Sequence, residues 1–278
     1  MLGFVCICLF RELIEKGCFL PNLLTLPMRI KNGNTLISKR QFNRIRRLLP
    51  VHKHKNLLDG RLVLSGLIYV IRNGLARRQL PEFFGNWSFV YSKFRRWSKR
   101  RVIKNVFVTL AGMLPKRCTA MIDSTYVKAQ RTATCMRSDG LPRELGRSRG
   151  GITTKIHLLC NDQQKPIDFI LSAGQVSDIK IAPQLVAGNK MKKLLADKAY
   201  DSDRFRNLLA SRQITACSPA KSNRKSPIPH DARLYGKRHK IENMFARLKD
   251  WKGIAFRSNK CAHTFHSYDA LALTYLFL

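Results

Sequence analysis

The sequence predicts an α/β fold, with a mixed central sheet flanked by helices, behind a smaller all-α segment. Apolar residues recur at helical spacing up to about residue 117, and short buried runs typical of strands begin near residue 118. The charges change at the same point, because residues 29–117 carry 22 Lys and Arg but only two acids. We therefore expect a basic helical part over 28–115 and an α/β part over 116–278.

The helical part has the pattern of capped helices. Ser38 is the candidate cap of a first helix that ends at Pro50, and a second helix spans 59–74. Residues 81–84 form one short turn. A further helix then begins near residue 86, capped by Asn86 or Ser88, and its apolar positions are Val90, Tyr91, Phe94 and Trp97.

This last helix also carries a basic face, which includes Lys93, Arg95 and Arg96. A short helix, a Gly turn and a basic helix form the outline of a helix-turn-helix module, in which these three side chains would contact DNA. An ordinary helical bundle with a solvated basic face predicts the same pattern. The pattern alone favours neither interpretation.

The second part alternates candidate strands with helices. The expected strands are 119–123, 152–160, 167–171, 194–197 and 214–217. The expected helices are 178–187, 202–211, a long one over 231–251, and an apolar one over 264–278. A mixed order of this kind around one sheet is typical of α/β domains.

The chain carries a formal net charge of +35, from 52 Lys and Arg against 17 Asp and Glu. Charge of this size predicts strong, salt-sensitive binding to a polyanion, because each neutralised phosphate releases counterions. A ribosomal or membrane-surface protein would be basic as well. The 45% content of hydrophobic residues allows a packed core and argues against a disordered chain.

The eight cysteines include no C-x-x-C pair, so we expect reduced thiols rather than a zinc site or a disulfide framework. No apolar run is long enough to span a bilayer, and we expect a cytoplasmic, nucleoid-associated protein without a membrane partner. Residues 1–27 hold three cysteines and only two basic residues. We interpret them as an extension upstream of a native start at Met28.

Two acids follow buried apolar runs in this basic chain. Asp123 comes after Met121 and Ile122, and Asp197 comes after residues 194–196. A lone acid at a strand end is usually a turn or cap residue. Two such acids, together with a third on a helix, fit metal-ion phosphoryl chemistry better, because hard cations need oxygen ligands.

The third acid lies on the long helix. Tyr235, Arg238, Glu242 and Lys249 follow one another at intervals of three, four and seven residues, which places them on one helix face. That face offers three groups for phosphates and one carboxylate for a metal ion. Arg238 and Glu242 also have the spacing of a simple i,i+4 salt bridge.

These four residues reproduce the pattern Y-x2-R-x3-E-x6-K and resemble the signature of bacterial insertion-sequence transposases with a DDE active site, in the insertion sequence four and five grouping. The segments 122–125, 146–157 and 197–201 resemble further motifs of that family, and 80–97 resembles its helical N-terminal region. The resemblance runs from about residue 37 to the end. Residues 1–27 have no counterpart, and Asp269 is unexpected on an apolar helix, where an unpaired carboxylate is costly.

The resemblance implies an RNase H-like fold for 116–278, with Asp123, Asp197 and Glu242 as catalytic residues that bind two Mg²⁺ ions, for which Mn²⁺ substitutes. It also implies that the helical part recognises the terminal inverted repeats of a mobile element, and that a homodimer forms on DNA. Arg147 and Arg149, in a Gly-rich loop, are further candidates for phosphate contacts, although a solvated loop is an equal alternative.

The expected activity is hydrolysis at the transposon end, which frees a 3′-hydroxyl, followed by attack of that hydroxyl on a target phosphodiester. Two other classes of protein share some of these features. An inactive or domesticated DNA-binding protein derived from a transposase explains the charge but not the carboxylates. A free-standing RNase H-like nuclease would cut DNA without regard to inverted repeats and would not join strands.

Overall fold

The computed structural model describes residues 36–50, 59–135, 143–224, 226 and 228–278. Contacts group Thr35–Leu278 into one compact unit. The proposed extension 1–27 and the proposed start at Met28 lie outside the described residues. None of the described helices is long and apolar enough to cross a membrane, and the described cysteines are free thiols.

The helical part contains, in chain order, α2 (Lys39–Arg46), α3 (Gly60–Asn73), η1 (Arg77–Gln79), η2 (Glu82–Phe84), α4 (Trp87–Lys99) and α5 (Val102–Gly112). The predicted caps form: Ser38 builds a capping box with Gln41, and Asn86 Oδ1 accepts a hydrogen bond from the Ser88 N–H. The first helix ends at Arg46 instead of Pro50, and α5 was not predicted.

The strands are β1 (Thr119–Ala129), β2 (Gly146–Ser148), β3 (Gly151–Asn161), β4 (Pro166–Ala173), β5 (Lys193–Leu195), β6 (Thr215–Cys217) and β7 (Phe256–Arg257). The central order is β4-β3-β1-β5-β6. β3 is antiparallel to both β1 and β4, whereas β5 is parallel to both β1 and β6. This order and these directions confirm the mixed sheet of an RNase H-like fold.

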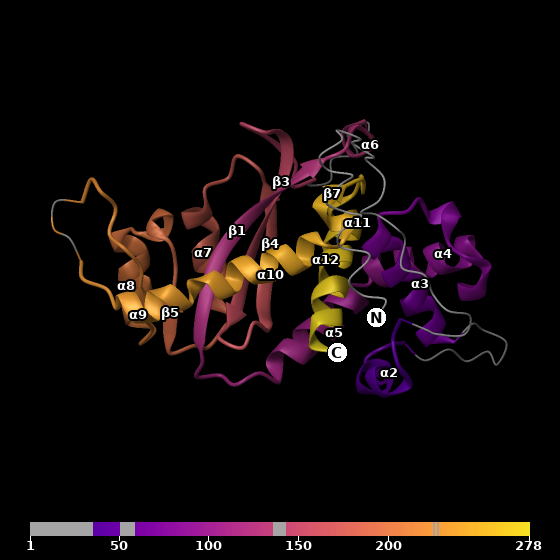
Figure 1. Ribbon diagram of the computed structural model, residues 1–278, viewed down its shortest axis with the longest axis horizontal. Helices are drawn as coiled ribbons and strands as arrows, with labels where there is room; N and C mark the ends of the chain where they lie inside the picture. The colour runs from indigo at the N-terminus through magenta and orange to yellow at the C-terminus, as the bar shows by residue number, and fades with distance from the viewer. Residues whose placement is uncertain (1–35, 51–58, 136–142, 225, 227) are drawn as a thin grey trace, which may run out of the picture. The chain divides into compact units, whose positions relative to one another are not determined.

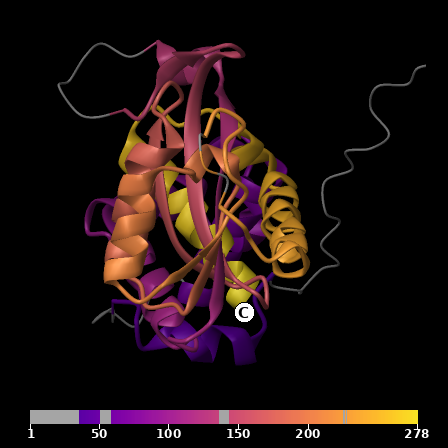
Figure 2. The ribbon, with the colours of Figure 1, turned by 90° about the vertical axis from the view of Figure 1, so that its left-hand side faces the viewer.

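The remaining helical elements are α6 (Arg131–Thr134), α7 (Asp178–Ala187), η3 (Lys198–Tyr200), α8 (Asp203–Ser211), α9 (Ala232–Tyr235), η4 (Gly236–Arg238), α10 (His239–Lys249), α11 (Lys252–Ala255) and α12 (Ala262–Phe277). Figure 1 shows α10 crossing in front of the sheet, with α12 beyond the right-hand end of the sheet. Figure 2 shows the sheet between α8 on one side and α10 on the other. The sheet is therefore covered on both faces, as the α/β prediction requires.

The core beneath α7 and α8 fixes which way each residue of β1 points. Ile122 packs there with Leu185 of α7 and Phe205 of α8. Side chains alternate between the two faces of a strand, so Asp123 points to the opposite face, where α10 contacts β1. The burial of Ile122 thus directs the first candidate carboxylate towards the long helical segment.

The C-terminal helix α12 joins the helical part to the sheet part. It packs against both α4 and α5. The ring of Phe107 on α5 lies 5.4 Å from that of Phe169 on β4 and 6.1 Å from that of Phe277 on α12. The two predicted parts therefore share buried aromatic contacts. Their division at residue 115 stays a prediction.

Candidate active site

Asp123 lies inside a strand, whereas the apolar run before it predicted a strand end. β1 continues to Ala129 because it pairs with the long antiparallel strand β3 as far as Lys128. On its other side, pairing with β5 ends at Met121. The backbone edge of β1 is therefore unpaired on the β5 side at Asp123.

Asp197 occupies the equivalent place after the neighbouring strand. Met121 pairs with Leu195 in parallel register, and each candidate aspartate follows its paired residue by two positions. Asp197 caps η3, and its Oδ1 accepts a hydrogen bond from the Ala199 N–H at 2.9 Å. Adjacent parallel strands therefore bring the two aspartates to the same region of the sheet.

Arg238 connects Asp123 to Glu242. Its Nη1 donates to Asp123 Oδ2 at 2.7 Å, and its Nη2 donates to Glu242 Oε1 at 2.5 Å. The i,i+4 salt bridge therefore forms, and the same guanidinium links Glu242 to Asp123, a strand residue 119 positions earlier in the chain. Glu242 stays more than half exposed, while Asp123 is largely covered.

Burial is the main influence on the Asp123 carboxyl, and it raises the pKa of Asp123 above its ordinary value. The Ser124 N–H, which donates to Oδ1 at 2.8 Å, and the Arg238 guanidinium act in the opposite direction. The negative charge of Asp197 raises the pKa further. A cation at this place would favour the ionised carboxylate.

The three carboxylates fit a hard divalent cation in their chemistry, since Mg²⁺ and Mn²⁺ prefer oxygen ligands. Among the described residues, however, no three acidic, His or Cys side chains are gathered closely enough to hold an ion. The Arg238 guanidinium stands as the cationic group between Asp123 and Glu242. Both carboxylates can bind a shared ion only when Arg238 moves away.

The residues predicted as one long helix form an unbroken helical segment that contains a 3₁₀ turn. Residues 232–249 run through α9, η4 and α10, so a 3₁₀ turn lies between Tyr235 and His239. Tyr235 is half-buried, with its ring edge-on to His230, and Lys249 is exposed at the end of α10. The 3₁₀ turn alters the helical spacing before Arg238, but the interval from Arg238 to Lys249 is almost entirely α-helical.

Comparison with known proteins assigns the family. A sequence profile described as "Transposase DDE domain" matches residues 114–277, and one described as "Putative transposase of IS4/5 family" matches residues 37–107. The first match covers more than half of the chain. The chain belongs to the DDE transposase family.

Two curated relatives agree with this assignment. The "Putative transposase for insertion sequence element IS6501" of Brucella ovis is 33% identical over 129 residues, which cover 46% of this chain and 99% of the relative. An uncharacterized protein of Sinorhizobium fredii is 33% identical over 109 residues, which cover 37% of this chain and 86% of that protein. Both alignments are shorter than half of the chain.

Solved transposase structures are more distant. The piggyBac transposase synaptic complex with hairpin DNA is 10% identical, with a TM-score of 0.39, over 68% of this chain and 48% of that chain. The Mos1 transposase paired-end complex with the left transposon end is 13% identical, with a TM-score of 0.29, over 96% of this chain and 90% of that chain. The transposase thus spans about half the length of the piggyBac chain.

Arg147 and Arg149 of the transposase lie on a hairpin, where the sequence analysis expected a Gly-rich loop. Arg147 belongs to β2 and pairs with Ile152 of β3, and Arg149 lies in the tight turn that follows. Gly151 has a φ of 96°, a conformation that glycine adopts without strain. Both arginine side chains are exposed, so a phosphate can reach them.

The structure corrects the expectation for Lys93 of the transposase. Its side chain is only 1% exposed, and its ammonium group lies over the rings of Phe89 and Trp97. Burial lowers the pKa of Lys93. Lys93 was predicted to lie on the basic face of α4, but it lies on the buried side of that helix. Arg95 and Arg96 are exposed, as expected.

Asp201 is a buried acid whose role the sequence analysis did not identify. It accepts hydrogen bonds from Arg206 Nε at 2.7 Å, the Lys221 N–H at 2.9 Å and Arg224 Nε at 3.0 Å. Burial would raise its pKa, but these donors lower the pKa of Asp201 to about 2. Asp201 therefore ties the basic loop after β6 to the segment that begins with Asp197. Its place in the 197–201 motif was the only sequence signal.

Proposed function

We propose that this transposase is an active enzyme that cuts double-stranded DNA at the terminal inverted repeats of a mobile element and joins the freed ends to target DNA. The observation that carries the proposal is the approach of Asp123 and Glu242 to one cationic group, with Asp197 just after the adjacent strand β5. Chain segments far apart in sequence thus supply carboxylates to one region in a protein of net charge +35.

Asp123, Asp197 and Glu242 are the residues that would hold two Mg²⁺ ions, with Mn²⁺ as a substitute. When bound, such ions supply the positive charge that favours a hydroxide or alkoxide nucleophile and a leaving oxygen. The carboxylates fix the place where that charge acts.

The remaining predicted residues act on the DNA backbone. Arg238 and Lys249 donate to phosphate oxygens near the cleaved bond, and Tyr235 donates its hydroxyl to a neighbouring phosphate. Arg147 and Arg149 on the β2–β3 hairpin, together with Arg95 and Arg96 on α4, contact phosphates farther away. These contacts orient the DNA so that the nucleophile attacks in line.

Two phosphoryl transfers make up the reaction. Water attacks the phosphorus at the transposon end, the bond to the 3′-oxygen breaks, and that oxygen leaves as a 3′-hydroxyl. The 3′-hydroxyl then attacks a target phosphodiester, and the target's own 3′-oxygen is released as a hydroxyl. Joining two ends requires two copies of the site, so we propose a homodimer on DNA that works at the bacterial nucleoid.

The test is a strand-transfer assay with a labelled DNA end that carries the inverted repeat, with Mg²⁺ or Mn²⁺ present. The wild-type chain should nick the end and join it to a second DNA. Asp197→Ala should lose both products while its affinity for the end stays within a few-fold. Strand transfer by Asp197→Ala would overturn the site assignment.

The same assay separates the alternative functions. Binding without any nicking by the wild-type chain would indicate an inactive, domesticated DNA-binding protein. Nicking that ignores the repeat and joins no strands would indicate a free-standing nuclease. Short inverted repeats on both sides of the gene would support the transposase independently.

A further inference from the structure

A cavity of about 480 Å³ lies away from the carboxylates, where α4, α5, β4 and α12 meet. Its walls include apolar atoms of Phe169, Leu171 and Ala262. A volume of this size lies within the roughly 300–1,000 Å³ typical of small-molecule sites, and seven of the eleven lining residues are polar or charged. None of its lining residues belongs to the candidate active site.

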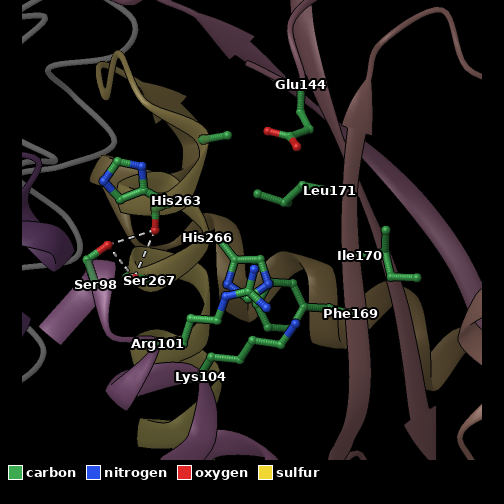
Figure 3. Close-up of a pocket in the computed structure, with 11 residues that line it drawn as sticks. Ser98, Arg101, Lys104, Glu144, Phe169, Ile170, Leu171, His263, His266 and Ser267 are labelled. Carbon is green, nitrogen blue, oxygen red and sulfur yellow. Dashed lines mark hydrogen bonds between the residues drawn. The ribbon is translucent and has the colours of Figure 1, made fainter. Parts of the chain in front are cut away.

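One end of the cavity is cationic. Arg101 and Lys104 both line it, and Figure 3 shows their side chains together at that end. Arg101 begins α5 with a φ of 55° and makes no side-chain cap. The N-terminus of α5 therefore adds its positive end to the two side-chain charges.

The opposite end is acidic. Figure 3 shows Glu144 across the cavity from Arg101 and Lys104. Its Oε2 is buried without a hydrogen-bond partner among the described residues, and its backbone φ is 46°. An unpaired buried acceptor is costly, and a bound donor would remove that cost. Glu144 and Arg101 are two of the four described non-glycine residues with positive φ.

A flat neutral ring lies between the two ends. His266 packs against Phe169 with ring centroids 4.4 Å apart and planes tilted by 32°. Burial, reinforced by the charges of Lys104 and Arg101, lowers the pKa of His266 to about 4, so the imidazole is neutral at pH 7. A neutral imidazole beside apolar walls suits an aromatic ligand better than a metal ion.

We propose that this cavity binds one nucleotide unit, with its phosphate at Arg101 and Lys104 and an amino-bearing base edge at Glu144. A phosphate ion alone would leave most of the volume empty. It would also leave Glu144 without a donor. The exocyclic amine of cytosine or adenine supplies that donor, whereas thymine presents an acceptor at the same edge.

Calorimetric titration of the full chain tests this proposal, with dCMP, dTMP and inorganic phosphate as probes. We expect dCMP to bind at least ten-fold more tightly than phosphate and several-fold more tightly than dTMP. Equal affinities for dCMP and phosphate would overturn the proposal, because they would leave no role for the walls or for Glu144.

Variants locate the site. Lys104→Ala and Arg101→Gly should each weaken dCMP binding about ten-fold, and Glu144→Gln should remove the preference for dCMP over dTMP. Arg101→Gly is informative because glycine prefers the observed φ, so lost binding cannot be ascribed to a weakened fold. The exposed Lys116, outside the cavity, gives the matched control Lys116→Ala, which should bind normally.

Two further measurements distinguish the site and the source of the nucleotide. Asp197→Ala should bind dCMP like the wild type, and loss of binding would place dCMP at the carboxylates and overturn the proposal.

Displacement of dCMP by DNA with one unpaired cytosine, but not by its paired counterpart, would identify a nucleotide of a DNA strand as the ligand. Displacement by neither would identify a free nucleotide. Equal displacement by both would place dCMP on an open DNA-binding surface and overturn the proposal.

Discussion

A single guanidinium, that of Arg238, joins two carboxylates that the transposase uses to hold divalent cations under our proposal. Arginine has a fixed positive charge, so it neutralises the site in the absence of an ion. An incoming cation must compete with it. Under the proposed function, Arg238 would exchange these carboxylates for a DNA phosphate when a cation binds.

Arg238→Ala should therefore bind Mn²⁺ more tightly than the wild type, by several-fold, while cleaving the transposon end more slowly. Electron paramagnetic resonance of free Mn²⁺ measures the first effect, and the nicking assay measures the second. Arg233→Ala, an exposed position in the same helical segment, is the control and should change neither. Unchanged Mn²⁺ affinity in Arg238→Ala would show that the guanidinium does not compete.

Asp269 is a second residue with an unusual environment. It is fully buried on α12, and neither carboxylate oxygen has a hydrogen-bond partner among the described residues. Burial raises the pKa of Asp269 well above its ordinary value, and Arg257 opposes this only in part. The folded state therefore favours the protonated acid. Keeping this carboxyl protonated lowers the free energy of unfolding once the pH exceeds about 3.9, because the unfolded chain ionises it from that pH upwards.

Asp269→Asn should accordingly gain stability relative to the wild type as the pH rises, by roughly 1.4 kcal/mol per unit until the folded pKa is reached. Thermal unfolding at pH 5 and pH 8 measures the effect. The melting temperature of Asp269→Asn should exceed that of the wild type by more at pH 8 than at pH 5. Asp250→Asn, at an exposed site, should show no such trend. A constant difference would mean that Asp269 is ionised in the fold.

At the scale of single elements, α4 shows how one helix divides its basic residues. Arg95 and Arg96 face solvent, whereas Lys93 packs under the rings of Phe89 and Trp97 together with the buried face of the helix. A cation over an aromatic face keeps part of its charge stabilisation without a hydrogen bond. Arg95, Arg96 and the exposed Lys99 at the end of α4 therefore remain available for phosphates, whereas Lys93 does not.

Arg96→Ala should reduce the slope of log K against log salt concentration by about one for DNA binding, because one phosphate contact is lost. Lys93→Met, similar in volume, should leave the slope unchanged and keep or raise stability, since it removes a buried amine that has no acceptor among the described residues. Gel-shift titrations over a range of salt concentrations measure both. A reduced slope in Lys93→Met would show that α4 rearranges to expose the lysine.

At the scale of the whole molecule, the helical part and the sheet part depend on each other. α12 packs on α4 and α5, and Phe107 contacts residues from both the sheet and α12. Contacts group Thr35–Leu278 as one compact unit. The aromatic contacts bury surface that either part would expose if it unfolded separately.

We therefore expect one cooperative unfolding transition for 35–278. Differential scanning calorimetry tests this, and the calorimetric and van't Hoff enthalpies should agree. The cost of exposing the α12 interface is the physical reason. Two separate transitions would show instead that the predicted boundary at residue 115 divides domains that fold independently.

Much of this transposase could be predicted without coordinates. Local patterns are enough for α3, whose cap Asp59 and terminal Gly74 are the predicted bounds of that helix, and for α7, whose bounds agree with 178–187. Caps and turns depend on neighbours within a few residues, so the sequence contains them completely. The charge of +35 and the order of the acidic motifs likewise follow from the chain alone, and they were sufficient to indicate the family.

Tertiary structure decided what depends on residues far apart. The length of β1 follows from its antiparallel partner β3, which is why Asp123 lies inside a strand instead of at its end. The burial of Lys93 and the bridge from Arg238 to Asp123 depend on which elements pack together. Periodicity identifies the face on which a side chain lies but not what covers that face. Long-range packing alone sets the contacts, the burial and the pKa of each charged group.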